Sequence, residues 1–507
     1  MNLLPPVRPR SGPSRWLGLL LGLMVTEVAR AAETPDAGTS GTTGLSAADA
    51  GAPAAQLPIP DGGSSDVLAT TEAPDAGLVP SGSEADAPRR ERADFRGQQD
   101  APATTGDVLI WVPRIILLPG YLVTEYVLRV PVGALSTTAE KNHWPSGIFN
   151  FFAFGPEHRG GVFPTFLIDF GVRPSVGLHF FWDDTFVRDN RFTADVAWGG
   201  SNWVTVAMGD RYNFTKADSL AVAARWNRRP DNLYYGIGPE VDVSSDARTR
   251  YGTDAISGSI DFEHVQGALK IKAAARIDRT IFRDYSCCSD PTLNERVAAG
   301  QLPAPPGFQQ NTTAASIPLS VVIDTRQPGP WNRSGVRAGV AVTPTVDVNR
   351  GFDRSWIRYG GTLQGFWDMT GTGRVLGLGV WADFVDPFGD QPVPFTNLVT
   401  LGGTEPFVGF ISGSLRDRSA LAAELSYNWP VFAHIDGVAA VSVGNVFDKH
   451  LRGFDVNLLR GSAELGIRTR DLGNSSFQFI VGVGTKPFRE GFELKTFRFS
   501  FGVTYAL

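Results

Sequence analysis

The sequence predicts an all-β fold, a 16-stranded antiparallel transmembrane β-barrel of the outer membrane formed by residues 160–507. Apolar and polar residues alternate beyond residue 160, as in 191–198, where every even-numbered residue is apolar. The alternating segments run to about ten residues, which suits a tilted strand crossing a bilayer, whereas soluble sandwiches typically use about five or six. Their even number is typical of bacterial outer-membrane barrels.

Residues 1–31 have the pattern of a signal peptide. Three arginines precede the apolar run 16–25, and the small residues Ala29 and Ala31 follow it at the spacing of a cleavage site. The apolar run is about ten residues long, which is too short for a spanning helix of roughly 20. We therefore expect cleavage after Ala31 and export of the remaining chain.

Two different segments separate the signal peptide from the barrel. Residues 32–105 are rich in Ala, Asp, Gly, Pro and Ser, with almost no aromatic residues, and this composition predicts a disordered linker. Residues 106–159 contain apolar stretches that three prolines interrupt, which predicts short amphipathic helical pieces. These pieces either lie against the periplasmic rim or enter the pore as a plug.

The barrel strands are expected to alternate between short periplasmic turns and longer outer loops. The long connections 281–314 and 387–417 follow odd-numbered strands, and the turns at 328–330 and 370–372 follow even-numbered ones. The expected strands are 163–173, 175–183, 190–199, 203–212, 216–227, 249–262, 265–280, 315–325, 335–347, 354–367, 373–386, 418–429, 435–446, 456–468, 476–486 and 494–506.

The charge and the cysteines limit the remaining function classes. A formal net charge of −6 argues against a nucleic-acid partner. The two cysteines, Cys287 and Cys288, are adjacent, so they form either a vicinal disulfide or two free thiols. No second Cys or His pair lies at metal-ligand spacing, and we predict neither a metal nor another cofactor.

The sequence does not predict an enzyme. The chain has six histidines, but none accompanies a nucleophile motif of the G-x-S-x-G type. His179 is expected on the second strand facing the lumen, near Arg173 and Asp183. A single lumenal histidine of this kind is typically a hydrogen-bonded structural residue, so we expect no catalytic site.

The barrel region resembles the BamA/TamA superfamily of outer-membrane insertases and translocases, also called bacterial surface antigens. The resemblance depends on the order and spacing of three stretches, since each stretch alone is weak. They are the turn Asp324-Thr325-Arg326 followed by Pro330 and Ser334-Gly335, the segment Leu401-Gly402-Gly403 with Phe407-Val408-Gly409-Phe410, and Glu424-Leu425-Ser426-Tyr427-Asn428-Trp429-Pro430 followed by Gly444-Asn445-Val446-Phe447.

This resemblance implies a function and a mechanism. A barrel of this type would assist translocation or insertion of a protein or lipid, with the loop 387–417 inside the lumen and a lateral opening between the first and last strands. The implied partners are outer-membrane lipids and lipopolysaccharide, the barrel assembly machinery during biogenesis, and an exported client or a POTRA-bearing partner. The alternative is a passive channel or structural barrel that has kept the fold without translocase activity.

The sequence departs from the family pattern in two respects. Residues 32–105 are too polar to fold the POTRA domains that receive clients in this family. The loop arginine that the family pairs with an aspartate on the barrel wall is replaced by Val408, and the aspartate by Ser442.

Other charges near the loop offer a substitute for this lost pair. Arg416, Asp417 and Arg418 follow the loop motif, and either arginine is a candidate partner for the lumen-facing Glu424. The alternative is that these loop charges are simply solvated.

Overall fold

The computed structural model describes residues 150–326, 334–369, 371–403, 405–432, 435–469 and 475–505. The expected signal peptide, the expected linker and most of the expected helical segment 106–159 lie outside these residues. The described end of that segment contains the short strand β1 (Ala153–Phe154) and the 3-10 turn η3 (Pro156–His158). No helix among the described residues is long and apolar enough to span a membrane.

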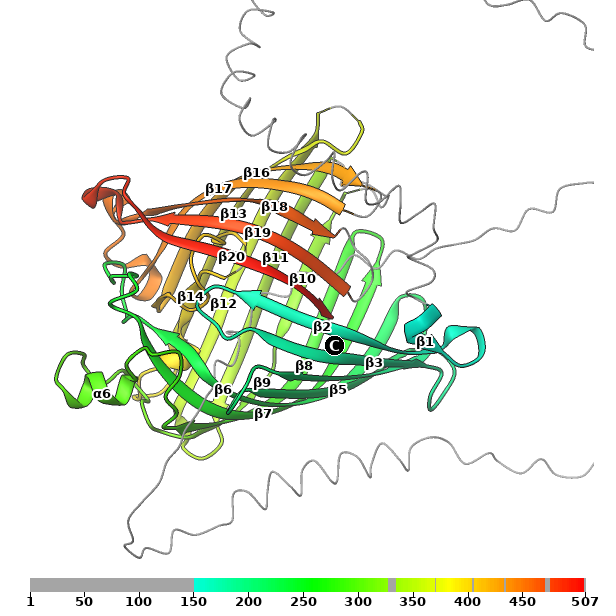
Figure 1. Cartoon of the computed structure of the whole chain (residues 1–507), viewed down its shortest axis with the longest axis horizontal. Coiled ribbons are helices and arrows are strands. Elements are labelled where there is room, and N and C mark those ends of the chain that lie inside the picture. Colours follow the sequence, from blue (N-terminus) through cyan, green and yellow to red (C-terminus); the bar gives the residue numbers. More distant parts are fainter. Residues whose placement is uncertain are drawn as a thin grey trace, which may run out of the picture. The chain divides into compact units, whose positions relative to one another are not determined.

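The chain forms one closed antiparallel barrel (Figure 1). Its sheet holds 18 strands, but β9 and β10 both pair with β8 and β11 as halves of one barrel strand, and β1 is a two-residue addition. The prediction of 16 antiparallel barrel strands is therefore confirmed. Their bounds are β2 (Gly160–Asp169), β3 (Ser175–Asp183), β4 (Asn190–Trp198), β5 (Val204–Asn213), β6 (Asp218–Tyr234), β7 (Thr249–Gln266), β8 (Leu269–Arg283), β9 (Thr312–Ser316) with β10 (Leu319–Asp324), β11 (Gly335–Asp347), β12 (Gly351–Asp368), β13 (Val375–Pro387), β16 (Ser419–Phe432), β17 (Ile435–Phe447), β18 (Arg460–Thr469), β19 (Ser475–Thr485) and β20 (Leu494–Tyr505).

The alternation seen in the sequence separates the two faces of the barrel wall. On β3, Val176 is 60% exposed and Leu178 is 54% exposed, whereas the next residue, His179, points inward and is only 1% exposed. Successive side chains of a strand point to opposite faces, so one face meets hydrocarbon and the other lines the lumen. On the other strands too, the outward-pointing positions carry exposed leucine, valine and tryptophan side chains, for example Leu363 and Leu378.

Three strands are longer than the sequence indicated, and one is interrupted. β6, β7 and β12 contain 17, 18 and 18 residues, so the expectation of about ten is wrong for them. Their outer ends continue to pair beyond the bilayer, where both faces can be polar. The expected strand 315–325 breaks at Pro318, because proline has no N–H to give to the neighbouring strand.

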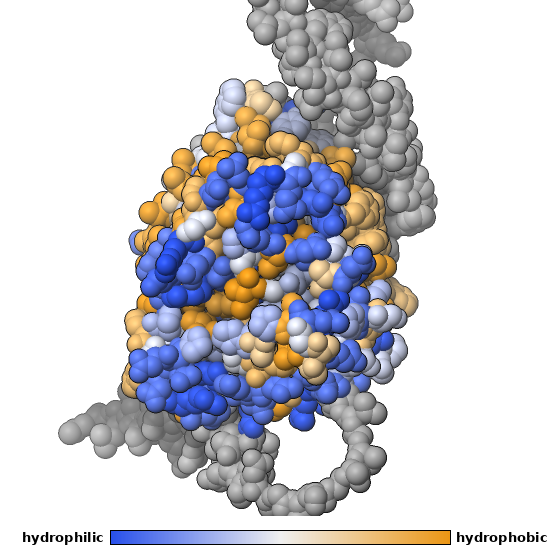
Figure 2. Space-filling view, turned by 90° about the vertical axis from the view of Figure 1, so that its left-hand side faces the viewer, coloured by the Kyte–Doolittle hydropathy of each residue, from blue (hydrophilic) through white to orange (hydrophobic). Residues whose placement is uncertain are grey.

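The hydrophobic core lies inside the barrel, at the end that carries the long loops. The residues of the core come from the strand ends and the loops, and include Tyr234, Phe395, Phe407, Phe410 and Leu415. Figure 2 views this end and shows a surface that is mostly hydrophilic, with apolar patches between the polar ones. The loops therefore close this end of the lumen with apolar side chains beneath a polar cover.

The remaining elements of this end are short. They are α6 (Leu293–Ala298), η4 (Phe395–Asn397), β14 (Val399–Leu401), β15 (Leu415–Asp417), η5 (Lys449–Leu451), η6 (Val456–Leu458) and η7 (Phe488–Glu490). The expected strand 456–468 thus begins later than predicted, because its first three residues form η6.

Candidate functional site: the lumenal loop and the seam of the barrel

The connection between β13 and β16, residues 388–418, folds into the barrel; we call it the lumenal loop. Its arms pair as the hairpin β14–β15, with Val399 opposite Asp417. Between these arms, the rings of Phe407 and Phe410 stack with their centroids 4.9 Å apart, and both side chains are completely buried. The family resemblance implied an inward loop at this position, and the structure places one there.

The tip of the lumenal loop is fixed to the last strands of the barrel by hydrogen bonds. The backbone N–H of Gly409 donates to Ser462 Oγ on β18 at 2.9 Å, and Thr496 Oγ1 on β20 donates to the Gly409 carbonyl at 2.7 Å. A Cβ on Gly409 would lie 2.1 Å from the carbonyl oxygen of Val483 on β19. Only glycine allows this close approach of two backbones, which explains the glycine in the motif.

A second connection between the loop and the wall is ionic. Glu405 of the loop pairs with Arg468 on β18, and Arg468 Nη2 also donates to Asn428 Oδ1 on β16 at 3.0 Å. The loop therefore contributes the anion and the wall the cation. This is the reverse of the loop arginine and wall aspartate that the family resemblance implied.

Of the two alternatives for the loop charges, the substitute pairing with Glu424 is not formed, and Arg416 and Asp417 are buried and not solvated. Arg416 is buried, donates to the Phe395 carbonyl at 3.0 Å, and lies over the rings of Tyr234, Tyr251 and Phe395. Its partners are thus a backbone carbonyl and aromatic faces.

Arg418 is also unavailable to Glu424, and it pairs with Asp386 at 2.7 Å. Arg418 and Glu424 are six positions apart along one extended segment, about 20 Å at strand spacing, so they cannot meet. The neighbouring Asp417, in the loop hairpin outside the spanning strands, is buried, and this burial raises its pKa to about 6.

Glu424 and Glu464 are buried on the lumenal side of the wall. In the part of the chain that the structure describes, Oε2 of Glu424 and both carboxylate oxygens of Glu464 have no hydrogen-bond partner. Glu464 lies on β18, opposite Gly482 of β19. The seated loop therefore gives no hydrogen bond to these three carboxylate oxygens.

The first and last barrel strands meet along a short seam. β2 and β20 share four residue pairs, from Phe166 opposite Val503 to Asp169 opposite Ser500. By contrast, β19 and β20 share eleven pairs, and β2 and β3 share eight. The seam is therefore held by fewer backbone hydrogen bonds than either adjacent strand pair.

One arginine crosses this seam. Arg498 of β20 donates from Nε and Nη2 to the two carboxylate oxygens of Asp169 on β2, at 2.8 and 2.6 Å. Its remaining nitrogen, Nη1, donates to the carbonyl oxygen of Val408 in the lumenal loop at 3.1 Å. A bidentate arginine–carboxylate pair is a strong and directional contact. A single side chain thus joins the last strand, the first strand and the loop.

The turn motif Asp324-Thr325-Arg326 closes β10 on β11. Arg326 pairs with Asp324 at 2.6 Å and lies over the ring of Phe366, while Thr325 Oγ1 donates to the Val336 carbonyl at 3.1 Å. The polar groups of these side chains bond to residues of the turn and the adjoining strands, which indicates that the motif has a structural role in stabilising the turn.

A cavity of about 410 Å³ occupies the other side of the lumen, mainly along β5 to β8. Small residues alternate there with long charged ones. Arg211, Arg225 and Arg276 line this cavity and form no ion pair with any described residue, whereas Lys272 is paired with Glu263.

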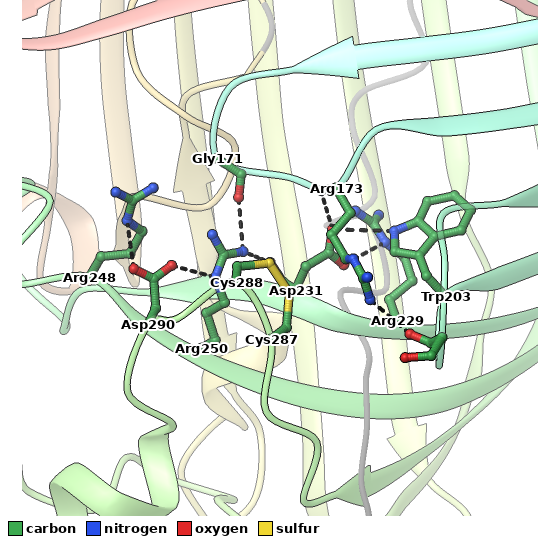
Figure 3. The surroundings of a disulfide bond; sticks show 11 residues. Gly171, Arg173, Trp203, Arg229, Asp231, Arg248, Arg250, Cys287, Cys288 and Asp290 are labelled. Carbon is green, nitrogen blue, oxygen red and sulfur yellow. Dashed lines mark hydrogen bonds and ion pairs between the residues drawn. A yellow bond between two sulfur atoms is a disulfide. The ribbon is translucent and has the colours of Figure 1, made fainter.

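The adjacent cysteines lie in the long loop after β8. The structure joins Cys287 and Cys288 in a disulfide, which is one of the two alternatives that the sequence left open. Cys287 is buried and Cys288 is exposed. The disulfide lies in a polar part of the loop, close to Asp290 (Figure 3).

Arg250 connects this loop to the rest of the outer surface. It donates to Asp290 at 2.6 Å, to the Gly171 carbonyl at 2.9 Å and to the Asp231 carbonyl at 2.7 Å (Figure 3). The loop after β8 is thereby fixed to the loop that follows β2. Asp231 in turn accepts from the ring N–H of Trp203.

His179 is buried on the lumenal face, as the sequence predicted, but its Nδ1 lies 2.8 Å from Asp195 Oδ1, whereas the expected neighbours Arg173 and Asp183 contact Asp231 and Arg191. Among the described residues, no group of three or more His, Cys, Asp or Glu side chains could hold a metal ion.

Comparison with known proteins identifies the type of barrel. An Omp85 superfamily domain matches residues 210–505. Among solved structures, BamA from Haemophilus ducreyi lacking POTRA domains 1–3 is similar at 14% identity and a TM-score of 0.50, covering 68% of this chain and 70% of that one. CdiB from Acinetobacter baumannii is 11% identical with a TM-score of 0.42, covering 68% of this chain and 59% of that one. No curated protein matches.

Proposed function

Because the chain belongs to the Omp85 superfamily, we propose that it assists the translocation or insertion of a protein or a lipid at the bacterial outer membrane. The observation that carries this proposal is the seam of four residue pairs between β2 and β20. Fewer backbone hydrogen bonds must break there than between β19 and β20. The seam serves as the lateral opening, the lumenal loop occupies the pore, and the mechanism has no catalytic step.

The proposed partners follow from the two faces of the wall. Outer-membrane lipids and lipopolysaccharide surround the outward apolar side chains, and the barrel assembly machinery inserts the chain during biogenesis. An exported client enters from the periplasm, with a POTRA-bearing partner delivering it. Entry from the periplasm is consistent with a barrel whose loops close the lumen at its outer end.

The proposal is tested by closing the seam covalently. Ile168 and Phe501 are opposite each other across the seam, so Ile168→Cys with Phe501→Cys provides a reversible cross-link. Val481→Cys with Phe499→Cys places the same cross-link between β19 and β20 as a control. We expect the seam cross-link alone to deplete particular proteins or lipids from the outer membrane, with recovery after reduction. An outer-membrane composition that is identical in both strains would contradict the proposal.

A passive channel is the second candidate, and the cavity of about 410 Å³ beside the lumenal loop favours it. Sixteen strands enclose enough space for an aqueous pore unless something fills it. Planar-bilayer recordings of the purified protein separate the two candidates. A large, steady, ion-selective current supports the channel, whereas a low, flickering conductance supports the translocator with its loop in place.

A further inference from the structure

The contact that holds the lumenal loop to the seam is made by a different residue from the one that the family pattern implies. Val408 and Ser442 stand where the resemblance implied a loop arginine and a wall aspartate. The guanidinium that reaches the loop comes from the wall instead, from Arg498 on the last strand. Its side chain is 6% exposed and that of its partner Asp169 is 13% exposed. Solvent therefore screens this ion pair weakly.

We propose that Arg498 is a latch with two positions, which couples the seating of the lumenal loop to the closure of the seam. In the first position its guanidinium holds Asp169 and the seam is closed. In the second it has left Asp169 for the carboxylate of Glu464, and the seam is free to part. This inference rests on the proposed function only in taking the seam as the place where the barrel opens.

The strand register places the second partner within reach. Glu464 on β18 lies opposite Gly482 on β19, and Gly482 lies opposite Arg498 on β20. The two charged residues are thus two strands apart, about 10 Å between backbones, and the glycine between them has no side chain. An extended arginine and a glutamate can span that distance together. Both carboxylate oxygens of Glu464 lack a hydrogen-bond partner among the described residues.

The lumenal loop determines which position the arginine takes. A Cβ on Gly482 would lie 2.8 Å from the Cα of Gly409, so the loop backbone covers the gap between Glu464 and Arg498. With the loop seated, the guanidinium is kept on the side of Asp169. When the loop leaves the wall, the path over Gly482 opens and a buried, unsatisfied carboxylate becomes available. Loop movement and seam release are therefore one event.

Hydrogen exchange of the whole protein in lipid nanodiscs, without any client, tests the latch. Two amides report on it: the N–H of Phe170 bonds to the Phe499 carbonyl across the seam, and the N–H of Gly409 bonds to Ser462. We expect Asp169→Asn to accelerate exchange at both amides by about tenfold, because the arginine then moves to Glu464 and displaces the loop.

The double variant is the decisive measurement. In Asp169→Asn with Glu464→Gln the second position is lost, so exchange at Gly409 should return to within about twofold of the parent protein while Phe170 stays fast. If Gly409 is unaffected in the single variant, or remains fast in the double variant, the two-position latch is wrong. If Phe170 is unaffected in the single variant, Asp169 does not hold the seam and the proposal also fails.

Two further variants keep these outcomes interpretable. Asp383→Asn removes the partner of Arg358, an inward ion pair between β12 and β13 away from the seam, and should leave both reporter amides unchanged. Should Asp169→Asn fail to fold, Arg498→Lys replaces it: lysine keeps the charge but cannot form the bidentate contact, so exchange should accelerate at both reporter amides, and unchanged exchange would contradict the latch. The exchange experiment uses no client, so its outcome is independent of the cross-linking experiment. The latch can therefore be confirmed or contradicted even if closing the seam leaves the composition of the outer membrane unchanged.

Discussion

Two halves of the barrel wall follow the same alternation of side chains but face different contents. On β18 to β20, small inward residues such as Ser462, Gly482 and Thr496 stand between charged ones, and the backbone of the lumenal loop lies directly against the small ones. On β6 to β8 the inward positions include long charged residues such as Arg225 and Arg276, and a cavity lies in front of them. Small and charged residues thus alternate in both halves, and what differs is that the charged residues of β18 and β20 contact the lumenal loop, whereas those of β6 to β8 line a cavity.

The largest expected effect comes from breaking the close contact on the loop side. Gly409→Ala places a Cβ 2.1 Å from a backbone oxygen, whereas the Cβ of Gly365→Ala on β12 meets nothing within 4 Å. We expect Gly409→Ala to cost about 1–3 kcal/mol of unfolding free energy and to raise single-channel conductance. Thermal unfolding in detergent and bilayer recordings measure both. Equal behaviour of the two variants would show that the loop tip does not depend on this contact.

A smaller effect is expected from the cavity side. Arg225 and Arg276 line the cavity without forming an ion pair with a described residue, and their neighbours Asp195 and Asp278 offset only part of their charge, so the charges act on any ion that passes. We expect Arg225→Gln with Arg276→Gln to shift the reversal potential in a salt gradient toward cation selectivity, with little change in stability. Arg159→Gln, outside the cavity, is the control. An unchanged reversal potential would mean that the conducting path avoids this wall.

The smallest effect is expected from the disulfide, which lies in neither half of the lumen. A bond between adjacent residues closes almost no loop, so it removes little entropy from the unfolded chain. Cys287→Ser with Cys288→Ser should therefore change the thermal unfolding temperature less than Arg250→Gln, which removes three contacts. The opposite ranking would show that the disulfide, rather than Arg250, holds the outer loops together.

Much of the fold could be predicted from the sequence because the bilayer imposes a regular pattern. Hydrocarbon on one side and a polar lumen on the other force alternation, so the number and order of the strands follow from periodicity. The outer ends of β6, β7 and β12 lie beyond that constraint, and their extra length was therefore missed. The break at Pro318 could be suspected from the proline but not predicted from it, since Pro164 and Pro344 lie inside continuous strands.

The candidate site was predictable in its position but not in its contacts. The motif around Phe407 indicated where the loop lies. The pairings of Glu405 with Arg468 and of Arg498 with Asp169 depend on register between strands far apart in sequence, which alternation alone does not fix. One signal was available: Arg498 is a charged inward residue between Phe497 and Phe499 on the last strand, so it needed a lumenal partner.

The wall of the barrel has unequal heights around its circumference. On one side of the seam, β2 has ten residues and β3 and β4 have nine each, and at a 45° tilt they rise about 21–23 Å, whereas the 18 residues of β7 and β12 rise about 42 Å. The apolar band of such barrels is about 25 Å tall. We therefore expect the membrane to thin by a few ångströms along β2 to β4, where this hydrophobic mismatch leaves the lipid less ordered than beside the longer strands. The lipid beside these short strands is then the part of the surrounding bilayer that is displaced most easily.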